Sequence, residues 1–277
     1  MQNRRGDNLV EVSIILATYN ESENLPLLVK KIHENAIFDF QIIFVDDGSS
    51  DGTREFILDY IANHPISKYI FNDGKQSILK AHCQGIEACD GEFVIIMDAD
   101  LQHPPEKIRE IYSNLKSGYI AVSGSRYMKE ASPGARSPLR GVISRTATLL
   151  AKLILRSARN LSDPLSGFFG MKREIFKPFN NGWRGYESFL FILASNPNLK
   201  LIEIPYVFGE RRNGESKIVK GTDFVRVFLT ELVLARRLEI SSSQSKSIPA
   251  FAAAHSKEMS SGINEQNSLR SGLRNDE

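Results

Sequence analysis

Apolar runs of strand length alternate along the first half of the chain with segments whose apolar residues recur at helical spacing. The strand-like runs cover residues 12–17, 41–45, 68–71, 92–97 and 120–123. The helical segments fall between them, over residues 25–32, 53–61, 77–88 and 104–115. Strands that alternate with helices in this way predict an α/β fold with a parallel sheet built from β-α-β units.

Polar segments follow three of these predicted strands. Thr-Tyr-Asn-Glu (18–21) follows the first, Asp46-Asp47 the second, and residues 98–102 the fourth. Because the carboxyl ends of parallel strands meet at one edge, we expect all three segments to line a single ligand-binding edge. Tyr19 can stack there on a base, and Asp47 can accept hydrogen bonds from a base or ribose. The sequence has no Gly-x-Gly-x-x-Gly or Walker-type loop, which disfavours a dinucleotide enzyme or a P-loop kinase.

The segment Asp98-Ala99-Asp100-Leu101-Gln102 carries the strongest chemical signal in the chain. Two carboxylates and one side-chain amide stand two residues apart, directly after an apolar run. Mg²⁺ and Mn²⁺ prefer oxygen ligands and keep their other positions for water and phosphate. The spacing therefore predicts a metal site at Asp98, Asp100 and Gln102 that clamps a diphosphate. Taken alone it is also compatible with an ordinary polar loop.

The second half of the chain is basic and amphipathic. Residues 126–159 contain eight Lys and Arg residues against one acid, Glu130, and they enclose the apolar segment 149–155. This pattern predicts a helix that lies on an anionic surface or packs on the protein's own core. Residues 224–240 predict a second apolar helix, whose charges place it at an interface instead of across a bilayer. We expect residues 241–277, rich in Ser, Asn, Gln and charge, to be disordered.

Composition narrows the protein class. The chain is 42% hydrophobic and 25% charged, as is ordinary for a soluble globular protein, and its net charge of +2 gives no argument for nucleic-acid binding. Cys83 and Cys89 lie in one predicted helical segment and are expected to be free thiols in a reducing compartment. No apolar run reaches the roughly 18 residues of a membrane span, and the first ten residues lack a signal-peptide core. We expect a cytoplasmic protein with peripheral membrane contact.

Six motifs occur in a fixed order between residues 11 and 220. They are Thr-Tyr-Asn-Glu (18–21), Val-Asp-Asp-Gly-Ser-x-Asp-Gly-Thr (45–53), Met-Asp-Ala-Asp-Leu-Gln-His-Pro-Pro-Glu (97–106), Gly-Ser-Arg-Tyr (124–127), Ser-Gly-Phe-Phe (166–169) and Arg-x-x-Gly-Glu-Ser-Lys (211–217). Together they resemble family 2 of the inverting, nucleotide-sugar-dependent glycosyltransferases, in particular the dolichyl-phosphate mannose synthases and related polyprenyl-phosphate sugar transferases.

The resemblance implies a Rossmann-like glycosyltransferase A-type fold, with a mostly parallel central sheet flanked by helices and with C-terminal amphipathic helices. It implies a flexible N-terminus over residues 1–10, a transferase domain over 11–240 and a tail over 241–277. Within the domain, residues 11–125 form the nucleotide and metal half, and residues 126–240 form the acceptor half.

The same resemblance implies metal-dependent, inverting transfer of a hexose to a polyprenyl or dolichyl phosphate, with mannose from GDP-mannose favoured and Mg²⁺ or Mn²⁺ as cofactor. The catalytic residues would be Asp100, Arg126, Arg140, Ser144 and Arg211, of which Arg140 and Ser144 hold the acceptor phosphate. The nucleotide-sugar site would comprise Ala17, Tyr19, Glu21, Val45, Asp47, Asp98, Ala99, Asp100, Gln102, Arg126, Arg211 and Lys217. The enzyme would lie peripherally on the cytoplasmic face of a membrane, directly or through a partner subunit.

Two departures and several alternatives stay open. Position 17 is Ala where the family usually has Pro, and residues 72–80 lack the usual Gly-Leu-Gly run. The alternatives are a UDP-glucose type of donor, a saccharide acceptor, an inactive sugar-nucleotide-binding subunit, and a nucleotidyltransferase. His103 could be a base or a ligand, but its place beside Pro104 favours an ordinary loop residue, and Asp163-Pro164 could simply end a helix.

Overall fold

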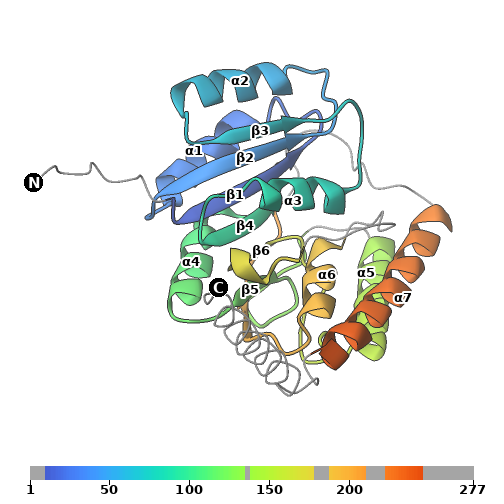
Figure 1. Cartoon of the computed structure of the whole chain (residues 1–277). Helices are drawn as coiled ribbons and strands as arrows, with labels where there is room; N and C mark the ends of the chain where they lie inside the picture. The colour runs from blue at the N-terminus through green and yellow to red at the C-terminus, as the bar shows by residue number, and fades with distance from the viewer. Residues whose placement is uncertain (1–9, 135–137, 178–186, 210–221, 246–277) are drawn as a thin grey trace, which may run out of the picture. The chain divides into compact units, whose positions relative to one another are not determined.

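A seven-stranded sheet forms the centre of the computed structural model, which describes residues 10–134, 138–177, 187–209 and 222–245 (Figure 1). The strand order is β3-β2-β1-β4-β6-β5-β7. The strands are β1 (Val12–Thr18), β2 (Phe40–Asp46), β3 (Lys68–Phe71), β4 (Phe93–Asp98), β5 (Ala121–Ser125), β6 (Phe169–Lys172) and β7 (Leu201–Pro205).

The sheet is mostly parallel, as the sequence predicts. β1 pairs in parallel with β2 and β4, β2 with β3, and β5 with β7. Only β6 runs against its neighbours β4 and β5 within this sheet. All five predicted strands are present with shifts of at most two residues at their ends, whereas β6 and β7 were not predicted.

Successive residues of a strand face opposite sides of the sheet, and a layer of helices covers each side. Val12, Ile14 and Leu16 of β1 pack with the buried residues of α1 (Leu25–Asn35), α2 (Thr53–Asn63) and α4 (Ile108–Lys116). Ile15 packs on the other face with α3 (Ile78–Glu87) and α6 (Ser188–Ser195). Gly85 lets α3 approach β1 closely, because a Cβ there would lie 2.6 Å from Ile15 Cγ2. Helices therefore cover both faces of the sheet, and the polar segments of the predicted site lie at the strand ends.

The two cysteines match the sequence prediction in the part of the chain that the structure describes. Cys83 lies on α3, Cys89 follows that helix, and both are buried free thiols. Burial raises the pKa of the Cys83 thiol to about 12 and that of Cys89 to about 11. Both are therefore protonated at neutral pH.

Three helices form a separate apolar cluster beside the sheet (Figure 1). α5 (Pro138–Ile154), α6 and α7 (Thr222–Ser245) meet through buried residues such as Ala151, Leu190 and Leu232. The predicted basic region covers residues 126–159, and α5 forms only part of it. The helix begins at Pro138, a residue suited to the first turn of a helix. α7 continues through residues 241–245, where disorder was predicted; residues 246–277 lie outside the described chain. None of the helices described here has both the length and the apolar character needed to cross a membrane.

Candidate active site

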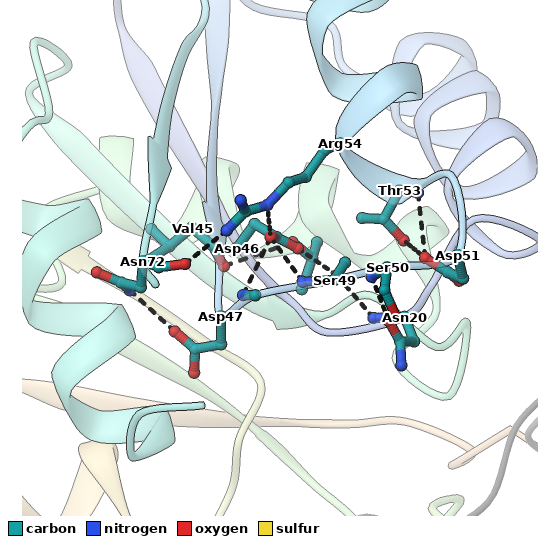
Figure 2. A network of polar contacts seen from close by, with 12 residues as sticks. Asn20, Val45, Asp46, Asp47, Ser49, Ser50, Asp51, Thr53, Arg54 and Asn72 are labelled. Carbon is teal, nitrogen blue, oxygen red and sulfur yellow. Dashed lines mark hydrogen bonds and ion pairs between the residues drawn. The ribbon is translucent and has the colours of Figure 1, made fainter. Parts of the chain in front are cut away.

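The first two strands end in a polar network built around Asp46 (Figure 2). This carboxylate is fully buried and accepts hydrogen bonds from Thr18 Oγ1 (3.1 Å), the Ser49 backbone N–H (3.0 Å) and Arg54 Nε (2.7 Å). Burial alone would raise the pKa of Asp46, but the donors lower it below its usual value. Asp46 is therefore an anion that fixes the loop after β2 through these hydrogen bonds.

Asp47 connects this loop to the segment where the chain departs from the family pattern. Its carboxylate accepts hydrogen bonds from Asn72 Nδ2 (2.9 Å) and from the Gln76 backbone N–H (3.0 Å). Burial nevertheless raises the pKa of Asp47. Lys75 Nζ lies 5.5 Å from the centre of the Tyr19 ring. Within residues 72–76, Asn72 and Gln76 thus contact Asp47, and Lys75 lies over the ring to which the sequence assigned base stacking.

The other predicted nucleoside residues lie at the same edge. Ala17 is in register with Val45 on one side and with Asp98 on the other. Glu21 is buried, and its Oε2 accepts a 2.7 Å hydrogen bond from Asn24 Nδ2 at the start of α1. The structure therefore brings Ala17, Val45 and Asp98 together, while Glu21 contacts the first turn of a helix.

The acidic loop after β4 has a constrained backbone. Leu101 has φ +65°, a left-handed conformation that is uncommon for a residue with a branched side chain. Asp100 is buried, and its Oδ1 accepts the Gln102 backbone N–H at 3.0 Å. Two hydrogen bonds attach the loop to Gly209: Gln102 Nε2 donates to the Gly209 carbonyl (3.1 Å), and the Gly209 N–H donates to the Gln102 carbonyl (2.8 Å).

These residues fit a hard divalent cation. The Gln102 amide nitrogen donates to the Gly209 carbonyl, so its amide oxygen would be the atom that joins the carboxylates of Asp98 and Asp100 in a metal site. Three oxygen donors are a suitable partial set for Mg²⁺ or Mn²⁺, which retain positions for water and phosphate. Among the described residues no cluster of three or more His, Cys, Asp or Glu side chains could hold a metal by itself.

Arg126 follows β5 and forms a buried ion pair with Asp163. Its Nε and Nη2 donate to the two carboxylate oxygens at 2.6 and 2.7 Å, and its backbone N–H donates at 3.1 Å. Burial alone would lower the pKa of Arg126, but Asp163 raises it. Glu203 Oε1 on β7 accepts a 2.8 Å hydrogen bond from the Asp163 backbone N–H. The interpretation of Asp163 as a helix end is therefore wrong: α5 ends at Ile154, and Asp163 anchors the arginine.

Glu187 is an acid of the site that the sequence analysis missed. It directly precedes α6, where Ser188 Oγ lies 2.7 Å from the buried Nδ1 of His82. Burial and the nearby charge of Glu231 raise the pKa of Glu187 to about 8, and Arg126 and Asp98 also act on it electrostatically. Its carboxyl is thus mainly protonated at pH 7 and can donate a hydrogen bond. An acid directly before a wholly apolar helix was the available signal.

The predicted acceptor and loop residues are only partly described. Ser144 lies on α5, and its Oγ is 2.7 Å from the hydroxyl of Tyr127, the neighbour of Arg126. Arg140 lies one helical turn earlier on α5, and its side chain is outside the described part of the structure. Arg211 and Lys217 also lie outside the described residues. Ser144 is therefore the predicted acceptor residue whose contact with the Arg126 region can be followed.

Comparisons with known proteins agree with this architecture. The family model for glycosyl transferase family 2 matches residues 13–179. A dolichol-phosphate mannosyltransferase of Pyrococcus furiosus is 34% identical over 217 residues, which are 78% of this chain and 61% of that protein. The Saccharomyces cerevisiae protein of the same name is 30% identical over 223 residues, 76% of this chain and 81% of that protein.

Solved structures share the fold at lower identity. Glucosyl-3-phosphoglycerate synthase from Mycobacterium tuberculosis, in complex with UDP, superposes with a TM-score of 0.58 at 18% identity. The superposition covers 85% of this chain and 86% of that one. The same enzyme with Mn²⁺ and UDP-glucose gives a TM-score of 0.54 at 20% identity, over 87% and 81% of the two chains.

Asp163→Asn should destabilise the protein strongly, since it leaves the buried Arg126 charge without its anionic partner. We expect a loss of about 3–5 kcal/mol in the free energy of unfolding, measured by urea denaturation. Glu106→Gln is the matched control: it breaks the solvent-exposed pair between Lys31 and Glu106 (2.8 Å) and should cost no more than about 1 kcal/mol. Equal losses in the two variants would contradict the role of Asp163.

Proposed function

We propose, from the premise that this chain belongs to glycosyl transferase family 2, that it moves mannose from GDP-mannose to a dolichyl or other polyprenyl phosphate with inversion. One observation carries this proposal. The relatives from Pyrococcus furiosus and Saccharomyces cerevisiae align with about three quarters of the chain, and both are named dolichol-phosphate mannosyltransferase. The common edge of Ala17, Asp47 and Asp98 supports it, because a nucleotide sugar needs base, ribose and diphosphate contacts side by side.

The donor would lie across the ends of β1, β2 and β4. Tyr19 and Asp47 would hold the nucleoside together with Ala17, Val45, Glu21 and Ala99. Asp98, Asp100 and Gln102 would hold Mg²⁺ or Mn²⁺, which supplies positive charge to the diphosphate and to the departing nucleotide. Arg126 uses Nε and Nη2 for Asp163, so its Nη1 would be the group that meets a phosphate. Arg211 and Lys217 would add further cations.

The acceptor would need little help from a base. A polyprenyl phosphate is already an anion at neutral pH and can attack the sugar directly. Arg140 and Ser144 would hold that phosphate and screen its repulsion from the donor. The contact of Ser144 with Tyr127 supports this assignment, because it links α5 to the residue beside Arg126.

The lipid tail would be met by α5 and α7. Val142, Ile143, Leu149 and Leu153 of α5 are exposed, as are Val225, Leu229 and Val233 of α7. Cations such as Arg145 and Lys152 stand between the exposed apolar residues of α5. Apolar residues flanked by cations suit an anionic membrane surface. We therefore propose peripheral contact with the cytoplasmic face of a membrane, directly or with a partner subunit.

A panel of radiolabelled sugar nucleotides tests the function. With polyprenyl phosphate and Mn²⁺, label from GDP-mannose should enter the organic phase, chelation should abolish transfer, and added metal should restore it. Asp100→Ala should lose most turnover because the diphosphate charge is uncompensated. Asp90→Ala, at the opposite end of β4, is the control and should keep it. Full activity in chelator would contradict the metal, and label entering only from UDP-glucose would contradict the donor.

Arg140→Ala and Arg211→Ala should separate acceptor from donor contacts. Losing one charge-assisted bond costs about 1.5–3 kcal/mol, roughly ten- to a hundredfold in affinity or rate. Arg140→Ala should raise KM for polyprenyl phosphate or lower kcat, with unchanged nucleotide binding by calorimetry. Arg211→Ala should weaken donor binding, turnover or both. If both variants weaken nucleotide binding equally, Arg140 belongs to the donor site.

Liposome sedimentation tests the membrane surface. The protein should bind anionic vesicles more than neutral ones, and salt should weaken the binding. Leu149→Glu with Leu153→Glu should reduce it, since these side chains are 57% and 64% exposed on α5. Leu58→Glu is the matched control, 47% exposed on α2. A wild-type protein that stays in the supernatant with both vesicle types at low salt would contradict direct membrane contact.

A further inference from the structure

His103 is buried at the end of the acidic loop, and both of its nitrogens face Asp98. Nδ1 accepts the Asp98 backbone N–H at 2.9 Å, and Nε2 lies 3.7 Å from Asp98 Oδ2. Because Nδ1 acts as an acceptor, the ring proton must be on Nε2. The protonated edge of the ring therefore faces the carboxylate of the same residue.

Aromatic side chains fix the ring in this position. Phe168 stacks on His103 with ring centres 5.2 Å apart and an interplanar angle of 11°. Tyr206 and Phe208 meet the ring edge-on, at 5.9 and 5.7 Å. Gly167 completes the enclosure, since a Cβ there would lie 3.4 Å from His103 Cε1. The imidazole is only 2% exposed, so it has little room to turn away from Asp98.

The contact between Asp98 and His103 also closes the loop that carries the proposed metal ligands. The closed segment contains the left-handed residue Leu101, whose conformation persists only where its surroundings hold it. Gly209 holds the Gln102 side of the loop, and His103 holds the Asp98 side. The side chain of Asp98 is 39% exposed, and the buried imidazole of His103 lies on one side of its carboxylate.

We propose that His103 is a positioning residue for the divalent cation: its buried imidazole holds the backbone and carboxylate of Asp98 in the orientation that binds metal. This inference rests on the proposed metal-dependent function. Neighbours that orient metal ligands commonly contribute ten- to a hundredfold to metal affinity. The imidazole stays outside the ligand set, and the aromatic enclosure fixes its direction.

The test uses substitutions that keep the ring packing or one of the contacts. His103→Phe fits the aromatic enclosure but removes both nitrogens, and Mn²⁺ affinity in the presence of GDP should fall about ten- to a hundredfold. His103→Asn retains an acceptor for the Asp98 N–H and should give an intermediate affinity. Free Mn²⁺ is counted by electron paramagnetic resonance. GDP binding without metal, measured by calorimetry, should stay within twofold of wild type, which a general disruption of the site would not allow.

His33→Asn is the matched control, because His33 contacts Phe40 and Tyr60 near the opposite edge of the sheet. Its Mn²⁺ affinity should equal that of wild type. A folded His103→Phe variant within twofold of wild-type Mn²⁺ affinity would overturn the inference. If that variant does not fold, His103→Asn decides in the same way: weakening beyond twofold supports the inference, and a smaller change overturns it. Absence of Mn²⁺ binding by the wild type with GDP would instead overturn the proposed metal dependence, and this inference with it.

Discussion

The in-register parallel pairing of β1 with β2 and β4 is the constraint on which the site depends. It sets Ala17 between Val45 and Asp98, so that three loops far apart in sequence leave the sheet at one edge. A shift of one residue in either pairing would move every strand side chain to the other face. Ile15 would then leave the α3 layer and Ile14 the α1 layer, which the two apolar layers do not permit.

β6 joins this edge to the second half of the chain. It pairs with both β4 and β5. Phe168, directly before β6, packs with the α1 side, and Phe169, its first residue, packs with the α6 side. Phe168 thereby reaches His103 in the acidic loop. The same connection carries Asp163 to Arg126, so a single antiparallel strand ties the proposed metal loop to the arginine after β5.

Local patterns were sufficient for the first half of the fold and insufficient for the second. β1 to β5 are apolar runs bounded by polar turns, and their parallel order follows from the intervening helices. β6 contains Gly170 and β7 contains Glu203, so neither segment is a continuous apolar run. α6 is buried all round, so it lacks the amphipathic pattern of a surface helix.

The candidate site could likewise be predicted from the sequence only in part. Asp47 and Asp98 could be proposed as site residues from the sequence because each follows an apolar run of strand length. The roles of Asp163 and Glu187 could not be predicted from the sequence. Arg126, for example, lies 37 residues before Asp163 and contacts it only in the folded protein. His103 is close to Asp98 in sequence, yet its role depends on Phe168, Tyr206 and Phe208, which arrive from later segments.

The negative charges of the site imply that an anionic donor binds together with positive charge. Asp98 and Asp100 add negative charge at the end of β4, and the ion pair with Asp163 already offsets the charge of Arg126. A nucleoside diphosphate is itself an anion, so it would be repelled from these carboxylates unless positive charge accompanied it. The divalent cation proposed at Asp98 and Asp100 would supply that charge at the diphosphate. The pKa of Glu187 is raised first by burial and then by the negative charges of Glu231, Asp163 and Asp98, so its proton removes one further negative charge from this group of acids.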